Sequence, residues 1–380
     1  MEITEIETAV IESPVAGASL PAQVGERSLD ISSVLVKVHT DEGITGLGES
    51  FYRSIEDNLF LEKSIQSMGR HLVGKDPQNV KRHWHELYLH VKRAGAYGAL
   101  SALDEAMWDI KGKKAGQPLY ELLGGKCGEV NTYATFPAEK ETDELIEDGH
   151  WLAEKGFKAM KVGAGFGISK DRERIREIQT NTPDDFGLAI DANTSYNFPD
   201  ALRVAKTASE YELEWFEEPI AHTDIEGQAE LNRKVTVPIS GYQTHTPHYP
   251  AVEHLKANAL EIYQPSLDYA GGVTGATRVA DLVEGFGKQL VPHALGPAVN
   301  YAASLHVAAA SRACSLIEFA VLSDEIDDPG VYIGGPHIKN QDDIRVEDGG
   351  RITPPERPGL GIELDEDTLE EYTVSSEDYL

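Results

Sequence analysis

Three short apolar runs, evenly spaced in the middle of the chain, constrain the fold more than any other feature. They end in the oxygen-bearing side chains Asp191, Glu217 and Gln243, and both intervals between these residues are 26 residues long. A βα unit recurs at this length, so the runs are predicted to be consecutive parallel strands with oxygen ligands at their C-terminal ends. A barrel builds a site for a hard cation such as Mg2+ in this way. The alternative is that Asp191 and Glu217 only cap helices, but two equal intervals favour the metal site.

Length and composition exclude several classes of protein. A chain of 380 residues with 41% apolar residues fits two domains, or a barrel with an added lobe. It contains no apolar run of membrane-spanning length, and its first residues lack the order of a signal peptide. We therefore expect a soluble, cytoplasmic protein that does not enter membranes. The two cysteines, Cys127 and Cys314, are far apart, which argues against a disulfide framework.

The formal net charge of −30 is extreme, with 64 acidic and 34 basic residues. It argues against nucleic acid or an anionic membrane as a partner, because phosphate binding needs clustered Lys and Arg. The acids are spread along the whole chain rather than gathered in a tail. We interpret this pattern as adaptation to a cytoplasm of high salt, where charge repulsion is screened within about 3 Å at 1 M.

The first third of the chain has a mixed pattern. Residues 3–11, 33–38 and 45–49 are predicted to be strands, with the last two forming an antiparallel hairpin. The segment Pro14–Asp30 is rich in Gly, Ala and Ser, and is predicted to be a mobile surface loop. Helical patterns dominate from residue 55 to residue 123.

From residue 130 onward, short apolar strands alternate with longer amphipathic helices. Eight strands within about 190 residues predict a closed parallel (β/α) barrel with its chemistry at the C-terminal strand ends. An open doubly wound sheet is the alternative, but it needs a glycine-rich turn after its first strand, and residues 137–139 are Pro-Ala-Glu. The strands are predicted at 132–136, 157–162, 186–191, 213–217, 237–240, 260–264, 289–293 and 316–320.

With these strand ends placed, the sequence resembles the mandelate racemase and muconate lactonizing enzyme group of the enolase superfamily. The resemblance covers nearly the whole chain and is most specific in residues 99–113 and 118–125, in Glu217-Glu218-Pro219 and in Gly271-Gly272-Val273-Thr274. It implies an α/β protein: a modified TIM-type (β/α) barrel under an α+β capping domain formed by the N-terminal segment and the C-terminal tail.

The expected domains are 1–125 for the N-terminal part of the capping domain, 126–342 for the barrel, and 343–380 for the returning tail. Residues 14–30 and 48–55 match the capping-domain loops that close over the substrate in this group. Members of this group are commonly octamers or dimers, so the resemblance also implies a homo-oligomer.

The resemblance implies that Mg2+ binds a substrate carboxylate while a base removes the proton on the adjacent carbon. Asp191 and Glu217 match the first two metal ligands of the group. The third position, normally Glu or Asp, is Gln243 here. The ligand set therefore carries two negative charges instead of three, which predicts weaker metal binding.

The group's Lys-x-Lys pattern is also altered. Lys161 matches the first lysine, usually a contact to the substrate carboxylate, whereas the second lysine, often the base, is replaced by Gly163. Lys161 is itself a candidate base if burial and nearby Mg2+ lower its pKa. His293 matches the catalytic histidine of the racemase-like and dehydratase branches. In relatives an aspartate pairs with that histidine, but Ser266 stands in its place, with Asp268 two residues on.

The remaining candidates come from the same matching. Glu318 matches an acid that contacts the substrate carboxylate, and Glu218 is expected to orient the metal ligands. The substrate-binding candidates are thus Glu318, Asn193, Ser266 and His245.

Together these residues predict an enzyme that acts on a small carboxylate. The leading hypothesis is a Mg2+-dependent lyase that dehydrates a sugar acid to a 2-keto-3-deoxy acid, because dehydration can use one bifunctional residue. An isomerase, either a racemase or epimerase or a cycloisomerase, is the second hypothesis. The third is a divergent member that binds an acid without turnover.

Overall fold

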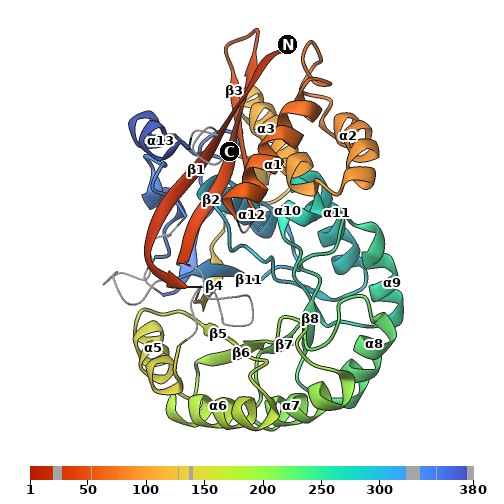
Figure 1. Ribbon diagram of the computed structural model, residues 1–380, viewed down its shortest axis with the longest axis vertical. Helices are drawn as coiled ribbons and strands as arrows, with labels where there is room; N and C mark the ends of the chain where they lie inside the picture. Colours follow the sequence, from red (N-terminus) through yellow and green to blue (C-terminus); the bar gives the residue numbers. More distant parts are fainter. Residues whose placement is uncertain are drawn as a thin grey trace.

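The computed structural model describes residues 1–19, 28–52, 54–126, 128–136, 140–321, 334–347 and 349–374, with the backbone alone given at 13–19 and 28–31. A three-stranded sheet with helices lies above a parallel barrel along the long axis of the molecule (Figure 1). The N-terminal elements are β1 (Ile3–Ser19), β2 (Ser28–Thr40), β3 (Thr45–Ser50), α1 (Ile55–Gly69), α2 (Val80–Ala94), α3 (Tyr97–Ala115) and α4 (Leu119–Leu122).

The N-terminal sheet has the order β1-β2-β3 and is antiparallel throughout, so the predicted hairpin is confirmed. The prediction of a loop at Pro14–Asp30 is wrong for most of that segment. The β1–β2 ladder continues outward to the pairs Pro14–Asp30 and Ser19–Ser28. The hydrogen bonds of an antiparallel ladder join backbone N–H and C=O groups, so residues with small side chains can also extend a hairpin. Residues 20–27 lie outside the described residues.

Strand β3 lies directly on helix α3 because two of its residues have no side chain. A Cβ atom at Gly46 would lie 2.1 Å from the carbonyl oxygen of Ala106, and one at Gly48 would lie 1.9 Å from that of Ala102. Both distances are far inside van der Waals contact. The two glycines therefore permit the close approach that joins the sheet to the helices.

The second half of the chain forms the predicted barrel. All eight predicted strands are present, and they pair in parallel in the order β10-β9-β8-β7-β6-β5-β4-β11. A parallel bridge between Leu290 and Cys314 joins the two ends of this sheet. The elements are β4 (Val130–Thr135), α5 (Thr142–Glu154), β5 (Ala159–Gly163), α6 (Ile168–Asn181), β6 (Gly187–Asp191), α7 (Phe198–Glu210), β7 (Trp215–Glu217), α8 (Ile225–Lys234), β8 (Ile239–Gly241), α9 (Tyr249–Ala257), β9 (Ile262–Tyr263), α10 (Leu267–Ala270), α11 (Gly272–Gly285), β10 (Gln289–Leu290), α12 (Ala298–Ala310) and β11 (Leu316–Ala320).

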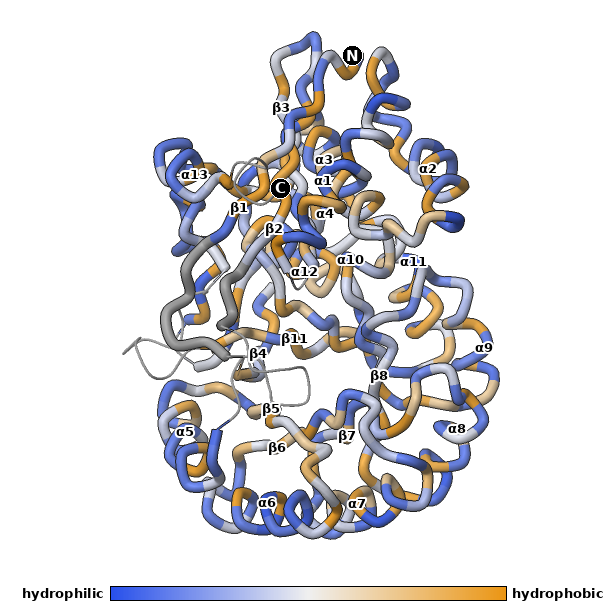
Figure 2. Tube along the Cα trace, viewed as in Figure 1, coloured by the Kyte–Doolittle hydropathy of each residue, from blue (hydrophilic) through white to orange (hydrophobic). Residues whose placement is uncertain are grey.

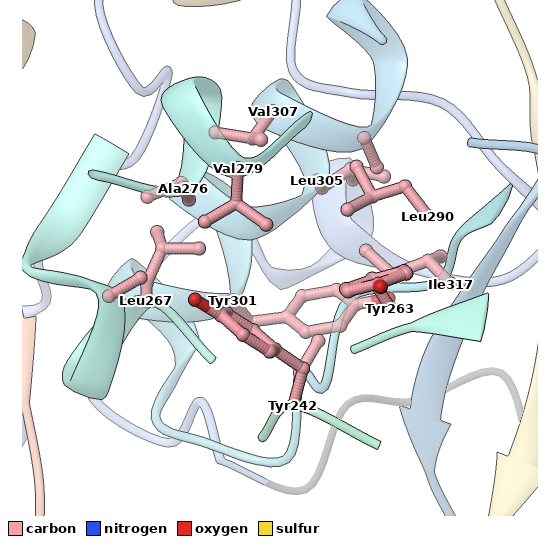
Figure 3. Packing of buried hydrophobic residues seen from close by; sticks show 14 of the residues in the cluster. Tyr242, Tyr263, Leu267, Ala276, Val279, Leu290, Tyr301, Leu305, Val307 and Ile317 are labelled. Atoms are coloured by element: carbon pink, nitrogen blue, oxygen red, sulfur yellow. The ribbon is translucent and has the colours of Figure 1, made fainter. Parts of the chain in front are cut away.

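The helices form an outer ring whose inner faces pack on the strands. Hydrophilic and hydrophobic residues alternate along these helices, as expected for amphipathic elements between a core and solvent (Figure 2). In Figure 3, Val279 of α11 and Leu305 of α12 lie in the same buried cluster as Tyr263 and Leu290 of the strands.

The C-terminal tail contacts both parts of the molecule through η2 (Gln341–Ile344), β12 (Arg351–Ile352) and α13 (Glu366–Tyr372). Strand β12 pairs antiparallel with β4 of the barrel. Further on, the amide of Leu360 donates to Asp109 Oδ1 at 2.8 Å, and the amide of Val374 donates to the carbonyl of Val10 at 2.8 Å. The domain boundaries expected from the sequence stay a prediction. Among the described helices, none has both the length and the apolar character needed to cross a bilayer.

Candidate functional site

The barrel interior is built in layers, and the alternation of the strands sets which residues reach its C-terminal end. One buried cluster fills the interior with Tyr133, Ala159, Ala189, Trp215, Ile262 and Val291, and Leu316 packs at its edge. Side chains two positions further along a strand point the same way. The residues at those positions, here called the polar layer, are Thr135, Lys161, Asp191, Glu217, Gln264, His293 and Glu318.

The first two candidate metal ligands lie side by side in this layer. Strands β6 and β7 pair Asp191 with Glu217 in register. Burial, and then the negative charge of Glu217, raise the pKa of Asp191 well above its ordinary value. The backbone amide of Asn193 donates to Asp191 Oδ1 at 2.8 Å and holds one oxygen in place. Two crowded carboxylates of this kind suit a divalent cation.

Gln243 follows β8 by two residues and is only partly buried. Its backbone carbonyl accepts a hydrogen bond from the amide of Ser266 at 3.4 Å, but its side chain makes no hydrogen bond within the described chain. An amide carbonyl and two carboxylates are oxygen donors that fit Mg2+. Because the third member is an amide, no group of three His, Cys, Asp or Glu side chains arranged for a metal occurs among the described residues.

The backbone is strained directly after the three strand ends that carry these ligands. Asn193 and Thr194 follow β6 with φ of 44° and 60°, Glu218 follows β7 with φ of 39°, and Tyr242 follows β8 with φ of 89°. Residues with a Cβ rarely adopt positive φ, and such residues cluster at functional sites. Positive φ angles at all three positions indicate that the ends of β6, β7 and β8 belong to one functional site.

Lys161 joins the acids of the polar layer. Its Nζ lies 2.9 Å from Glu318 Oε1, 3.1 Å from both oxygens of Glu217, and 4.0 Å from Asp191 Oδ2. Burial acts to lower the pKa of Lys161, but Glu217 and Glu318 outweigh it and raise that pKa well above the ordinary value. Lys161 is therefore an ammonium ion here. This state suits a contact to a substrate carboxylate, and a role for Lys161 as a base stays a prediction.

Glu318 connects Lys161 to His293. Glu318 Oε2 accepts a hydrogen bond from the amide of Ala294 at 3.0 Å and lies 3.9 Å from His293 Nε2. Burial acts to raise the pKa of Glu318, but Lys161 and then His293 together lower it below its ordinary value. Glu318 is therefore a carboxylate that faces both candidate proton-handling residues.

Within the described chain, neither Ser266 nor Asp268 forms a hydrogen bond with His293. Ser266 Oγ donates to Asp268 Oδ2 at 3.3 Å. Asp268 Oδ1 in turn accepts from Ser50 Oγ at 2.5 Å and from the amide of Phe51 at 3.4 Å. Asp268 thus binds the end of β3 in the N-terminal domain. The role of Ser266 in substrate binding stays a prediction.

The remaining candidates border the polar layer. The His245 ring stacks on Tyr242 with 4.4 Å between centroids, and burial together with His254 and His222 lowers its pKa to about 3. His245 is therefore a neutral imidazole. Burial and the charge of Glu217 raise the pKa of Glu218 to about 7.

Gly163 is exposed at the end of β5, in register with Asp191. Among the described residues, a Cβ atom added there would meet only ring atoms of Phe166 within 4 Å, at 3.7 and 3.8 Å. These are ordinary contacts, so the described residues leave room for a side chain at this position.

Sequence reasoning missed two residues that touch Glu217. Gln264 Nε2 donates to Glu217 Oε2 at 2.7 Å, and Trp215 Nε1 donates to the same oxygen at 3.2 Å. Gln264 closes the predicted strand 260–264, so it occupies the same kind of strand-end position as Asp191. Applying the strand-end argument to all eight strands, rather than to three, could have found it.

The chain is similar to known proteins over most of its length. Residues 145–368 match the family model described as enolase C-terminal domain-like, and residues 5–124 match the N-terminal domain of mandelate racemase and muconate lactonizing enzyme. Arabinonate dehydratase of Saccharolobus solfataricus is 29% identical, with 90% of this chain and 91% of that protein covered. D-Galactarolactone cycloisomerase of Agrobacterium fabrum is 30% identical, with 98% of this chain and 99% of that protein covered. The crystal structure of L-talarate dehydratase from Polaromonas sp. JS666 with Mg and L-glucarate has a TM-score of 0.86 at 25% identity, with 98% of each chain covered.

Proposed function

Because the chain belongs to the mandelate racemase and muconate lactonizing enzyme group of the enolase superfamily, we propose that it is a Mg2+-dependent dehydratase of a sugar acid. The reaction removes the proton from the carbon next to the carboxylate and expels the hydroxyl group on the following carbon as water. The resulting enol becomes a 2-keto-3-deoxy acid. Relatives named for arabinonate and talarate support a sugar acid as the substrate class.

The observation that carries this proposal is the one-sided arrangement of the site. His293 shares the barrel end with Asp191 and Glu217, while the opposite candidate position, Gly163, has no side chain. A racemase needs a base on each face of its substrate, but a dehydratase can use one residue as base and then as acid. The absence of a side chain at Gly163 therefore favours dehydration.

Side chains of the polar layer, together with Gln243 after β8, have distinct tasks in this mechanism. A Mg2+ ion held at this site would supply positive charge that acidifies the C–H bond next to the substrate carboxylate. Asp191, Glu217 and the side-chain carbonyl of Gln243 would hold the ion. The Lys161 ammonium would donate to the substrate carboxylate and favour the charge that develops on it. Glu318 keeps Lys161 charged and in place.

His293 handles the proton in both steps. As a neutral imidazole it takes the proton from the carbon next to the carboxylate, and as an imidazolium it returns that proton to the leaving hydroxyl group, which departs as water. The negative charge of Glu318, 3.9 Å from Nε2, favours the imidazolium between the two steps.

The test is a screen of sugar acids with MgCl2 in molar KCl, with the 2-keto acid detected as its semicarbazone. We expect at least one substrate for the wild type, and a loss of at least about 100-fold in kcat for His293→Asn, as for removal of a general acid-base residue. His150→Asn is the matched control, because His150 is exposed on helix α5. Equal activity of His293→Asn and the control would refute the assigned role of His293.

A cycloisomerase is the second candidate, because the relative from Agrobacterium fabrum carries that name and is similar over nearly its whole length. Such an enzyme would open or close a ring of its substrate. Isomerisation of a sugar-acid lactone with no formation of a keto acid would support the cycloisomerase. If the protein binds Mg2+ but converts neither sugar acids nor their lactones, the result would favour a member that binds an acid without turnover.

A further inference from the structure

The two oxygens of the Glu217 carboxylate have different surroundings. Oε2 accepts hydrogen bonds from Gln264 Nε2 at 2.7 Å, Lys161 Nζ at 3.1 Å and Trp215 Nε1 at 3.2 Å. Within the described chain, Oε1 accepts only from Lys161, at 3.1 Å. One oxygen is therefore fixed by three donors, while the other keeps capacity for a further partner.

The donors themselves are held rigidly. Gln264 and Glu217 are fully buried, and Trp215 is 1% exposed. The backbone amide of Gln264 donates to the carbonyl of Gly241 at 2.7 Å, which ties the end of β9 to the end of β8. The edge of Trp215 packs against Tyr133, with 4.9 Å between ring centroids. Neither donor can leave Glu217 without disturbing the barrel interior.

Both added donors are uncharged, and this matters for a cation site. An amide N–H and an indole N–H fix the direction of a carboxylate without neutralising its charge. A second lysine in either place would compete with a cation for the same negative charge. Accurate placement of Glu217 is especially important here, because the third candidate ligand, Gln243, carries no charge.

We propose that Gln264 and Trp215 are positioning residues that fix the Glu217 carboxylate for divalent cation binding and direct Oε1 toward the ion. This inference rests on the proposed Mg2+ dependence. Loss of hydrogen-bond partners behind metal ligands reduces metal affinity about 10–100-fold in other proteins. We assign Gln264 the larger contribution to cation affinity, because its hydrogen bond to Glu217 is the shorter one, at 2.7 Å.

The experiment measures cation affinity without substrate, so that it does not depend on turnover. Mn2+ is titrated into the full-length protein by electron paramagnetic resonance, and Mg2+ competition gives its Kd. The variants are Gln264→Leu, which keeps the side chain's size, and Trp215→Phe, which keeps a ring against Tyr133.

Two matched control variants remove an amide group and an indole N–H at positions outside the site. Gln228→Leu removes a buried amide that donates to the carbonyl of Ala221 at 3.4 Å. Trp108→Phe removes an indole N–H that donates to Thr274 Oγ1 at 2.8 Å.

We expect the Kd for Mn2+ to rise about 10–100-fold in Gln264→Leu and by a smaller factor in Trp215→Phe, with both controls within twofold of the wild type. The proposal is overturned if both site variants also stay within twofold, or if the controls shift as much. Should Gln264→Leu fail to fold, Trp215→Phe decides by the same criterion. Wild-type protein that binds no divalent cation overturns this proposal and the proposed function together. Wild-type protein that binds Mn2+ but dehydrates no sugar acid overturns only the function.

Discussion

Replacing Lys161 with methionine tests whether the lysine neutralises the acids of the polar layer. Its Nζ contacts Glu318 at 2.9 Å and Glu217 at 3.1 Å, and all three side chains are buried. Methionine has a similar unbranched shape, so the core stays filled while the charge is lost. Removing one partner of a buried ion pair costs about 3–5 kcal/mol, because the other charge is left buried and uncompensated.

This free energy can be expressed as a change in melting temperature. An unfolding entropy of about 2.1 cal/mol/K per residue, applied to 380 residues, gives roughly 0.8 kcal/mol/K. We therefore expect Lys161→Met to lower Tm by about 4–6 °C, measured by circular dichroism in EDTA at neutral pH. Lys158→Met is the control, because Lys158 is exposed and has no ion pair in the described chain. It should change Tm by less than about 1 °C.

Adding MgCl2 extends the same experiment. A divalent cation at Asp191 and Glu217 replaces part of the lost positive charge, so Mg2+ should raise the Tm of Lys161→Met by more than it raises the Tm of the wild type. The reasoning fails if Lys161→Met melts no lower than Lys158→Met in EDTA. It also fails if Mg2+ stabilises the wild type at least as strongly as the variant.

Three further predictions concern charge. Gln243→Glu should tighten Mg2+ binding about tenfold or more by adding a ligand charge; calorimetry that shows equal or weaker binding would contradict Gln243 as a ligand. Burial lowers the pKa of His306 to about 4, below its unfolded value, so unfolding takes up a proton and stability falls as pH drops from 6.5 toward 4. The loss is about 3 kcal/mol, and guanidinium titrations of His306→Gln should show a smaller loss between pH 7 and pH 4. Finally, the net charge of −30 predicts that Tm rises between 0.1 and about 2 M KCl as repulsion is screened, and a flat or falling Tm would exclude salt adaptation.

The barrel could be predicted from the sequence because its signal is local. Each strand is a short apolar run followed by an amphipathic helix, and the eight predicted strands all occur. The predicted ends of two strands were too long. The strand predicted at 289–293 pairs only over Gln289–Leu290, since Pro292 has no N–H to donate. The strand predicted at 260–264 is shorter at both ends and covers Ile262–Tyr263, although the amide of Gln264 still donates to the carbonyl of Gly241.

Features that depend on distant partners could not be predicted. The extension of the β1–β2 hairpin through residues 14–19 depends on pairing with residues 28–30, and composition alone indicated a loop. The direction of Asp268 is set by Ser50 and Phe51, which lie more than 200 residues earlier. The sequence identifies an acid near His293, but only the packing of β3 against the barrel shows that this acid faces another way.

Two of the three departures from the family's pattern, Gln243 and Gly163, offset each other in charge, whereas the third, Ser266 in place of an aspartate, removes a further negative charge. The pattern normally has an acid at the first position and a lysine at the second, and this chain has an uncharged residue at both. Gly163 is in register with Asp191, so the missing cation and the missing anion belong to the same barrel end. Either change alone would leave an unbalanced charge at this end of the barrel, where charge interactions at about 4 Å reach several kcal/mol. These two changes offset each other in charge, and the second one removes the base from one face. An enzyme that works from the His293 face alone needs no lysine at position 163, so the change to Gly163 supports the proposed dehydratase over a racemase.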